Sequence, residues 1–100
     1  MLGVFNGYNS SQGEDGNFLT AQQVKKDLVG EIDAVLQYGQ HIHDSTNKIA
    51  KQTWQHIRDE ELVHIGELLG LFKFLQPEQF AYIKDGFDEF EEHKTEWMSN

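Results

Sequence analysis

The residues that could do chemistry in this chain lie within a long amphipathic segment. Glu61 and His64 are three positions apart, which places both side chains on one face of a helix. They belong to a stripe at steps of four and three that is otherwise apolar: Ile57, Glu61, His64, Leu68, Leu71 and Leu75. A carboxylate among apolar residues is costly unless a partner compensates its charge. Helix bundles use an inward Glu-x-x-His pair to bind two metal ions, so the pair predicts a metal site.

A second acidic residue interrupts the apolar stripe of the preceding segment. That stripe runs through Val24, Leu28, Glu31, Val35, Tyr38 and Ile42. A di-iron carboxylate site in a four-helix bundle takes one Glu from each of two helices and Glu-x-x-His from each of the other two. Glu31, Glu61 and His64 make half of that set, and a two-fold dimer would complete it. The oxygen-rich donors with an imidazole favour iron or manganese over structural zinc.

Several neighbouring residues have more than one interpretation. Tyr38 lies two turns after Glu31, where it is either a ligand's hydrogen-bond partner or redox-active phenol, or a core tyrosine whose hydroxyl reaches the bundle edge. Asp33 and Glu60 are either solvated surface residues or a secondary site through which cations enter. The alternative for the whole set is that the two glutamates and the histidine pair with one another, without metal, in a helical oligomerisation or adaptor module.

Three helices are predicted to position these residues. Local signals predict helices over about 21–44, 47–75 and 77–97. These signals are a capping box at Thr20, turn-forming residues at 44–47 and Pro77. The short turn makes the first two antiparallel. Residues 1–19 lack a sustained period and predict a flexible arm ahead of a helical domain at 20–100. The fold class is all-α: an antiparallel two-helix hairpin plus a C-terminal helix, which dimerises into a four-helix bundle.

Composition limits the partners of this chain. At 100 residues, two or three long helices cannot bury all their apolar faces alone, so we expect a homo-oligomer. The net charge of -9 argues against nucleic acid and membrane surfaces and favours cations. The absence of cysteine excludes disulfides, Fe–S clusters and thiolate metal sites. We recognise no signal peptide and no membrane-spanning run, and we expect a cytoplasmic protein.

Two segments resemble the encapsulated ferritins, short ferritin-like proteins of the ferritin and rubrerythrin superfamily. They are Glu31-Ile32-Asp33-Ala34-Val35-Leu36-Gln37-Tyr38 and Arg58-Asp59-Glu60-Glu61-Leu62-Val63-His64, within a similarity over roughly residues 20–95. The resemblance implies a ferritin-like four-helix bundle made by two chains, with dimers assembled into an annular oligomer. It implies that Glu31, Glu61 and His64 bind iron and that Tyr38 lies next to these ligands without binding the metal itself. Gly30 and Gln37 depart from the family pattern, which often has Glu and Trp there.

The same resemblance implies an activity and a partner. The expected activity is that of a ferroxidase, an enzyme that oxidises Fe(II) to Fe(III) with dioxygen or peroxide, for iron storage and detoxification. An open ring cannot hold a mineral, so the resemblance also implies an encapsulin shell as partner and the inside of that nanocompartment as location. A rubrerythrin-like peroxide reductase is the alternative enzyme, which would take its electrons from another protein because the chain has no cysteine.

Overall fold

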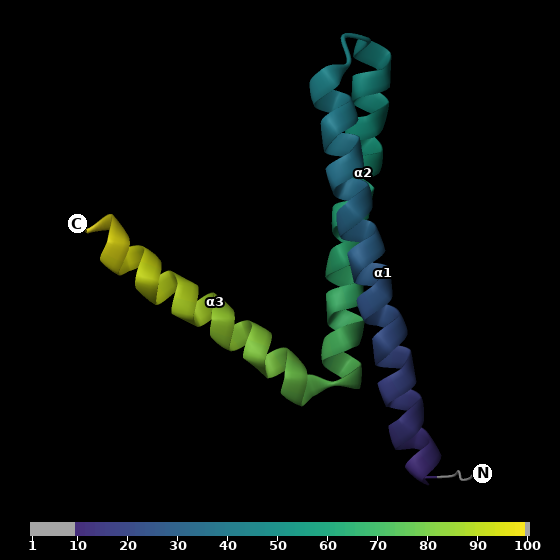
Figure 1. Ribbon diagram of the computed structural model, residues 1–100, viewed down its shortest axis with the longest axis vertical. Helices are drawn as coiled ribbons and strands as arrows, with labels where there is room; N and C mark the ends of the chain where they lie inside the picture. Colours follow the sequence, from purple (N-terminus) through teal and green to yellow (C-terminus); the bar gives the residue numbers. More distant parts are fainter. Residues whose placement is uncertain (1–9, 100) are drawn as a thin grey trace.

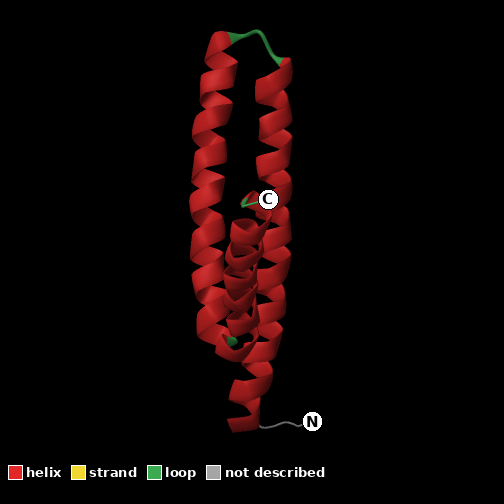
Figure 2. Cartoon of the chain, turned by 90° about the vertical axis from the view of Figure 1, so that its left-hand side faces the viewer, coloured by secondary structure: helices red, strands yellow, loops and turns green. Residues whose placement is uncertain are grey.

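The computed structural model describes residues 10–99, and regular structure within that range is entirely helical. Helix α1 spans Ser10–Asp44, α2 spans Lys48–Leu75 and α3 spans Pro77–Met98. The first two helices lie side by side and antiparallel, while α3 leaves the open end of this hairpin at an angle (Figures 1 and 2). The architecture confirms the predicted all-α fold class. None of the three helices carries an apolar stretch long enough to cross a membrane.

Helix α1 begins earlier than its capping box predicts. Residues 10–19, which the sequence assigned to a flexible arm, form the first turns of α1, and residues 1–9 of that arm lie outside the described residues. Ala21 and Val24 are buried and hold the adjacent turns in helical form. Extending an existing helix adds a hydrogen bond for each residue fixed, whereas starting one is costly. The helix therefore extends through Thr20 although that residue could cap it.

The turn between α1 and α2 follows local capping chemistry. The side chain of Asn47 accepts a hydrogen bond from the backbone N–H of Ala50 at 2.9 Å and so caps the start of α2. The backbone N–H of Asn47 donates to the Ser45 hydroxyl at 3.0 Å, which tightens the loop. The chain reverses over three residues between the helices, and α1 and α2 are antiparallel as predicted (Figures 1 and 2).

A one-residue break separates α2 from α3. Gln76 has φ -137° and ψ 68°, outside the helical region, and its N–H donates to the carbonyl of Phe72 at 2.8 Å. Pro77 follows at the first position of α3, where its missing N–H costs nothing. The rings of Phe72 and Phe80 pack edge to face, with centroids 5.8 Å apart. This elbow sends α3 away from the hairpin.

The core of a single chain is small. Of the described residues, only Ala21, Val24 and Phe72 are buried apolar residues. The radius of gyration is 19.3 Å, whereas a compact domain of this length has about 13 Å. Large apolar side chains remain exposed along all three helices: Val29, Ile32, Leu36, Leu62, Val63, Leu71, Phe74, Ile83, Phe87, Phe90 and Trp97. A monomer with these surfaces in water lacks most of the burial that stabilises a domain, which favours association.

Candidate metal centre

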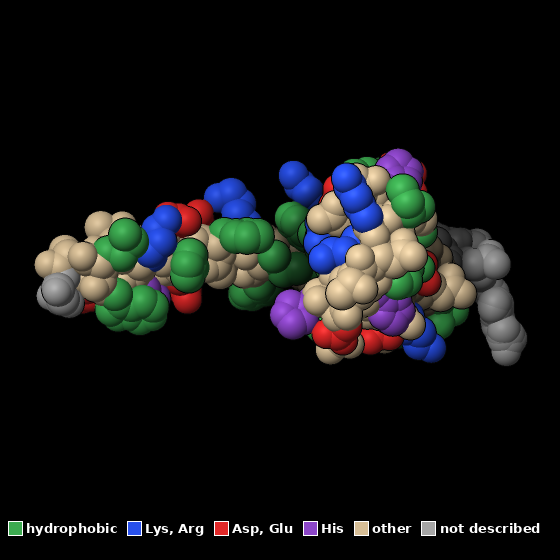
Figure 3. Space-filling model, turned by 90° about the horizontal axis from the view of Figure 1, so that it is seen from above, with side chains coloured by type: hydrophobic (Ala, Val, Ile, Leu, Met, Phe, Trp, Pro, Cys, Tyr) green, Lys and Arg blue, Asp and Glu red, His purple; other side chains and the backbone are tan. Residues whose placement is uncertain are grey.

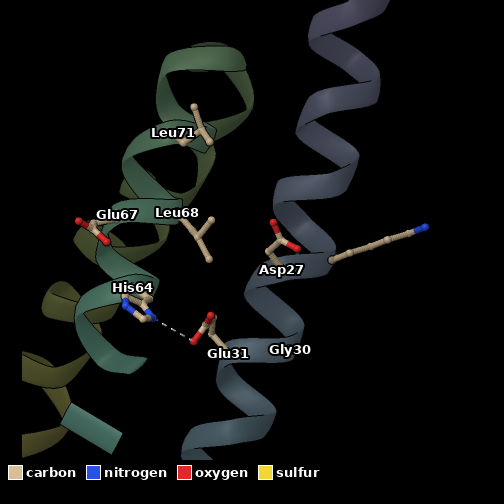
Figure 4. Close-up of a pocket in the computed structure, with 8 residues that line it drawn as sticks. Asp27, Gly30, Glu31, His64, Glu67, Leu68 and Leu71 are labelled. Atoms are coloured by element: carbon tan, nitrogen blue, oxygen red, sulfur yellow. Dashed lines mark ion pairs between the residues drawn. The ribbon is translucent and has the colours of Figure 1, made fainter. Parts of the chain in front are cut away.

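The three predicted ligands lie together near the middle of the hairpin. One ligand atom from each of Glu31, Glu61 and His64 lies within 4.8 Å of the other two. His64 Nδ1 is 3.4 Å from Glu61 Oε1 and 3.6 Å from Glu31 Oε1. Figure 4 shows His64 on α2 pointing toward Glu31 on α1. In the described part of the chain no other group of three or more His, Asp or Glu side chains is gathered in this way.

The carboxylates of this cluster are half-buried, and one oxygen lacks a partner. The side chains of Glu31 and Glu61 are 25% and 20% exposed, while that of His64 is 49% exposed. Glu31 Oε1 is buried and accepts no hydrogen bond from the described residues. Its neighbour Glu61 is also an acceptor when ionised, so it cannot satisfy that oxygen. A cation would satisfy both carboxylates at once, and the donor set therefore fits a metal ion.

The crowding of the two carboxyl groups raises the pKa of Glu61 above its ordinary value. The largest cause is the hydrogen bond that a protonated Glu61 makes to Glu31. Desolvation and the negative charge of Glu31 act in the same direction, whereas His64 lowers the pKa. A proton held between crowded carboxylates can be displaced by a cation, because metal binding requires deprotonated ligands.

Tyr38 lies outside this cluster. It is seven positions after Glu31 in α1, which is about 10 Å along the helix axis. Its ring packs edge-on against His41, with centroids 6.3 Å apart, and the ring of His41 lies 4.9 Å from that of Trp54. The tyrosine is half-buried between the cluster and the hairpin turn. Its role beside the ligands stays a prediction.

The two acids of the predicted secondary site also lie apart from the cluster. Asp33 is exposed on α1, and Glu60 is exposed on α2, where its Oε2 lies 3.5 Å from Nε2 of His56. Both positions are compatible with solvated surface residues. Their part in cation entry stays a prediction.

Two acids that were not predicted from the sequence share a pocket with two of the ligands. Asp27 is one turn before Glu31, and Glu67 is three residues after His64. Both line an open pocket of about 490 Å³ that also contains Glu31 and His64. Figure 4 shows this pocket between α1 and α2, with Leu68 and Leu71 beside the acids. The spacings of four and three residues from the ligands were the signal that could have identified both acids.

Sequence comparisons find related proteins but no match to a known protein-family profile. The chain is 33% identical over 70 residues to the encapsulin nanocompartment cargo protein EncC of Myxococcus xanthus, an alignment that covers 70% of this chain and 54% of that protein. It is 32% identical over 65 residues to a ferritin-like–encapsulin shell fusion protein of Pyrococcus furiosus, covering 65% of this chain and 19% of that protein. The chain thus spans about half the length of the first relative and a fifth of the second.

A solved structure has the same fold. The crystal structure of the encapsulated ferritin domain from Pyrococcus furiosus superposes with a TM-score of 0.73, over 92% of this chain and 87% of that one, at 24% identity. That likeness establishes the fold; of the two sequence relatives, the fusion protein is described as ferritin-like, and both are described as encapsulin proteins. The chain therefore has the fold of the encapsulated ferritin domain, and its sequence is similar to those of an encapsulin cargo protein and a ferritin-like–encapsulin shell fusion protein.

Proposed function

We propose that this protein is a ferroxidase, which oxidises Fe(II) to Fe(III) at a di-iron site formed between two copies of the chain. The observation that carries the proposal is the cluster of Glu31, Glu61 and His64, whose ligand atoms lie within 4.8 Å of one another beside an open pocket. The ferritin-like fold and the relative described as ferritin-like support an iron-related role. Iron storage and detoxification are the processes this activity would serve.

Two copies are needed because each chain offers only half of the ligands. A di-iron carboxylate site uses four carboxylates and two histidines, and one hairpin supplies two and one. The pocket opens beside Leu68 and Leu71, and Leu71 is 41% exposed. A second hairpin placed there by a two-fold axis would cover these leucines and bring the matching ligands. Coordination and burial of apolar surface thus favour the same dimer.

The side chains have distinct parts in this proposal. Glu31 and Glu61 neutralise the charge of the iron ions, and such oxygen donors favour the ferric state. His64 binds as a neutral imidazole through one ring nitrogen, and Nδ1 is the one near the carboxylates. Two Fe(II) ions supply two electrons. Dioxygen takes them with two protons to give hydrogen peroxide, or peroxide takes them with two protons to give water.

The surroundings of the cluster suit a cationic substrate. Asp27 and Glu67 line the pocket that leads to the ligands, and Lys26 is the one base that lines it. Acidic walls raise the local concentration of cations. Asp33 and Glu60 remain candidates for an outer site, and Tyr38 for a residue that supports the ligands. These acids would guide Fe(II) toward the cluster.

An encapsulin shell is the partner that we propose. The relatives are an encapsulin cargo protein and a ferritin-like domain fused to an encapsulin shell. The hairpin and its extended third helix enclose no space in which oxidised iron could collect (Figure 1). A shell around an annular assembly of dimers would supply that space, and the protein would then work inside the nanocompartment.

Ligand substitutions test the activity. Glu61→Ala and His64→Ala should each reduce Fe(II) oxidation, followed by the absorbance of Fe(III), to the rate of iron in buffer. Asp59→Ala is the matched control, because Asp59 lies on the same helix, is exposed and pairs with Arg58 outside the cluster. A ligand variant that oxidises Fe(II) as fast as the wild-type protein would refute the assignment.

Two further measurements separate the alternative functions. Native mass spectrometry with and without Fe(II) identifies a metal-free adaptor if no iron binds and the mass of the assembly stays the same. Turnover of peroxide with an added reductant, in the absence of iron uptake, identifies a rubrerythrin-like reductase. The ferroxidase proposal requires bound iron and its net oxidation.

A further inference from the structure

Three aromatic side chains lie in contact with one another between the metal cluster and the hairpin turn, and we call them the aromatic row. The ring of Tyr38 packs edge-on against that of His41, with centroids 6.3 Å apart. The ring of His41 lies 4.9 Å from that of Trp54 on α2. All three side chains are half-buried. The row therefore crosses from α1 to α2 through packed rings rather than through bulk water.

Both ends of the aromatic row lie two helical turns from the cluster. Tyr38 is seven positions after Glu31 in α1, and Trp54 is seven positions before Glu61 in α2. Because the helices are antiparallel, both displacements run toward the turn, by about 10 Å. Helical side chains lean toward the N-terminus of their own helix, so Tyr38 leans back toward the cluster and Trp54 leans toward the turn. Tyr38 is thus the near end of the row and Trp54 the far end.

The far end of the row is close to the surface at the turn. Figure 3 looks onto the turn end of the hairpin and shows histidine side chains (purple) reaching the surface there. Tyrosine and tryptophan are the two aromatic side chains that give up an electron most readily, and each loses a proton with it, from the phenol O–H or the indole N–H. Electron transfer slows steeply with distance, and His41 fills the gap between these two rings. The row therefore has the composition and the contacts of an electron path.

We propose that the aromatic row supplies one electron to the metal site when that site holds a single Fe(II) ion. The inference rests on the proposed function, because the electron acceptor is peroxide that reacts with the iron. Reduction of hydrogen peroxide to two water molecules takes two electrons and two protons. Two Fe(II) ions supply both electrons, whereas a single ion supplies one and leaves a hydroxide ion and a hydroxyl radical beside the ligands.

Tyr38 provides the missing electron in this proposal. The O–O bond of peroxide breaks, Fe(II) becomes Fe(III), and the phenol of Tyr38 gives up one electron and its proton. One further proton comes from the solvent in the open pocket, so that two water molecules form. Tyr38 is left as a neutral phenoxyl radical, and no hydroxyl radical is released against Glu31, Glu61 or His64.

Trp54 then restores Tyr38. An electron passes from the indole of Trp54 through the ring of His41 to the phenoxyl radical, which takes a proton from solvent and becomes a phenol again. The indole N–H releases its proton to solvent, and the radical now resides on Trp54. Addition of dioxygen to this radical forms a carbon–oxygen bond on the indole ring. The oxidative damage is thereby moved from the ligands to a residue near the turn, where it leaves a mark that can be measured.

The experiment measures which tryptophan of the full chain is oxidised. Anaerobic protein receives one Fe(II) ion per pair of chains and then one equivalent of hydrogen peroxide, and after admission of air peptide mass spectrometry measures the oxygen added to each tryptophan. The chain has two tryptophans. Trp97 is 64% exposed on α3, whereas Trp54 is half-buried. A hydroxyl radical that escapes into solution oxidises the exposed ring first, so we expect the opposite order, with Trp54 oxidised several-fold more than Trp97.

Tyr38→Phe removes the phenol and keeps a ring against His41. Oxidation of Trp54 should then fall to the level of Trp97, because phenylalanine is much harder to oxidise. Tyr82→Phe is the matched control, since Tyr82 is 78% exposed on α3 and lies outside the row. It should leave the oxidation of Trp54 unchanged.

Variants of His41 test its place between the two donors. His41→Ala opens a gap, so the radical should remain on Tyr38, where freeze-quench electron paramagnetic resonance detects a phenoxyl signal. His41→Phe puts a ring back into the gap and should restore the oxidation of Trp54. A purely structural role of His41 would not move the radical from one residue to the other.

The outcomes separate the aromatic row from the ferroxidase. Oxidation of Trp97 equal to or greater than that of Trp54 would overturn the row, and so would a Tyr38→Phe protein that oxidises Trp54 as the wild type does. Fe(II) oxidation at two ions per pair of chains is measured on the same preparations. A wild-type protein that oxidises Fe(II) but spares Trp54 keeps the proposed function and loses the row. A protein that oxidises Fe(II) no faster than buffer overturns both.

Discussion

Glu31→Gln should stabilise the metal-free protein and at the same time abolish its metal binding. The variant replaces a carboxylate whose buried Oε1 has no hydrogen-bond partner among the described residues by an amide that can donate to Glu61. An unsatisfied buried acceptor costs about 1–3 kcal/mol. Because the Glu31 side chain is 25% exposed, we expect the lower end of that range, a gain of about 1 kcal/mol in the free energy of unfolding.

The loss of metal affinity should be much larger. A two-fold dimer of Glu31→Gln lacks two of its four carboxylates, and affinity should fall at least about a hundredfold, or about 2.8 kcal/mol. The gain in the free energy of unfolding is measured by urea unfolding in the presence of a chelator. All samples have the same protein concentration, because dimer stability depends on concentration. Calorimetric titration with Mn(II), which does not oxidise in air at neutral pH, measures the loss of affinity.

Asp59→Asn is the control for both measurements. Asp59 is exposed and its carboxylate pairs with Arg58 outside the cluster, so its substitution should leave metal affinity unchanged and change stability by less than about 0.5 kcal/mol. A Glu31→Gln protein that is less stable than the wild type without metal would show that the oxygen is satisfied in solution. Unchanged metal affinity would show that Glu31 is not a ligand. Either result refutes the reasoning from the orphaned oxygen.

Three further predictions concern the pH dependence of the site and local helix stability. The pKa of Glu61 is higher in the folded protein than in the unfolded chain. In metal-free protein, the stability that Glu61 contributes should therefore be present at low pH and be lost as pH rises through the folded pKa. Metal affinity should rise over the same pH range, because the ligand must be deprotonated. Unfolding and Mn(II) titrations at a series of acidic pH values measure both trends, and parallel trends would contradict the prediction. Gly66→Ala should raise the free energy of unfolding by about 1 kcal/mol, because an added Cβ there meets no atom within 4 Å; a loss of stability in urea would show a close contact at this position. Asn47→Ala should lower that free energy by about 1 kcal/mol, since its side chain caps α2 at Ala50; no change in thermal unfolding would show that the cap is replaced by water.

The hairpin and its cluster follow directly from sequence spacing. Glu31 and the Glu61–His64 pair interrupt two apolar stripes of helical period. When those stripes pack against each other in an antiparallel hairpin, the three side chains lie between the two helices. The turn at Asn47 and the break at Pro77 carry their own local signals, and the structure places helix ends there. Such features depend on residues close in sequence, which is why they were predictable.

The remaining features depend on contacts that are distant in sequence. The start of α1 was placed too late, because burial of Ala21 and Val24 extends the helix through a segment with weak helical signals. The direction of α3 depends on Gln76 and on the contact of Lys25 with Gln79, which no helical pattern indicates. Asp27 and Glu67 could be recognised only from the folded structure, in which they line one pocket together with Glu31 and His64.

The sharing of one metal site by two chains is tested most directly by anaerobic titration with Fe(II), followed by sedimentation. Without oxygen the ions bind but are not oxidised, so mass and stoichiometry report on the ligands alone. We predict that binding saturates at two iron ions per pair of chains and that monomers disappear at the same ratio. Saturation at one ion on a chain that remains monomeric would contradict it.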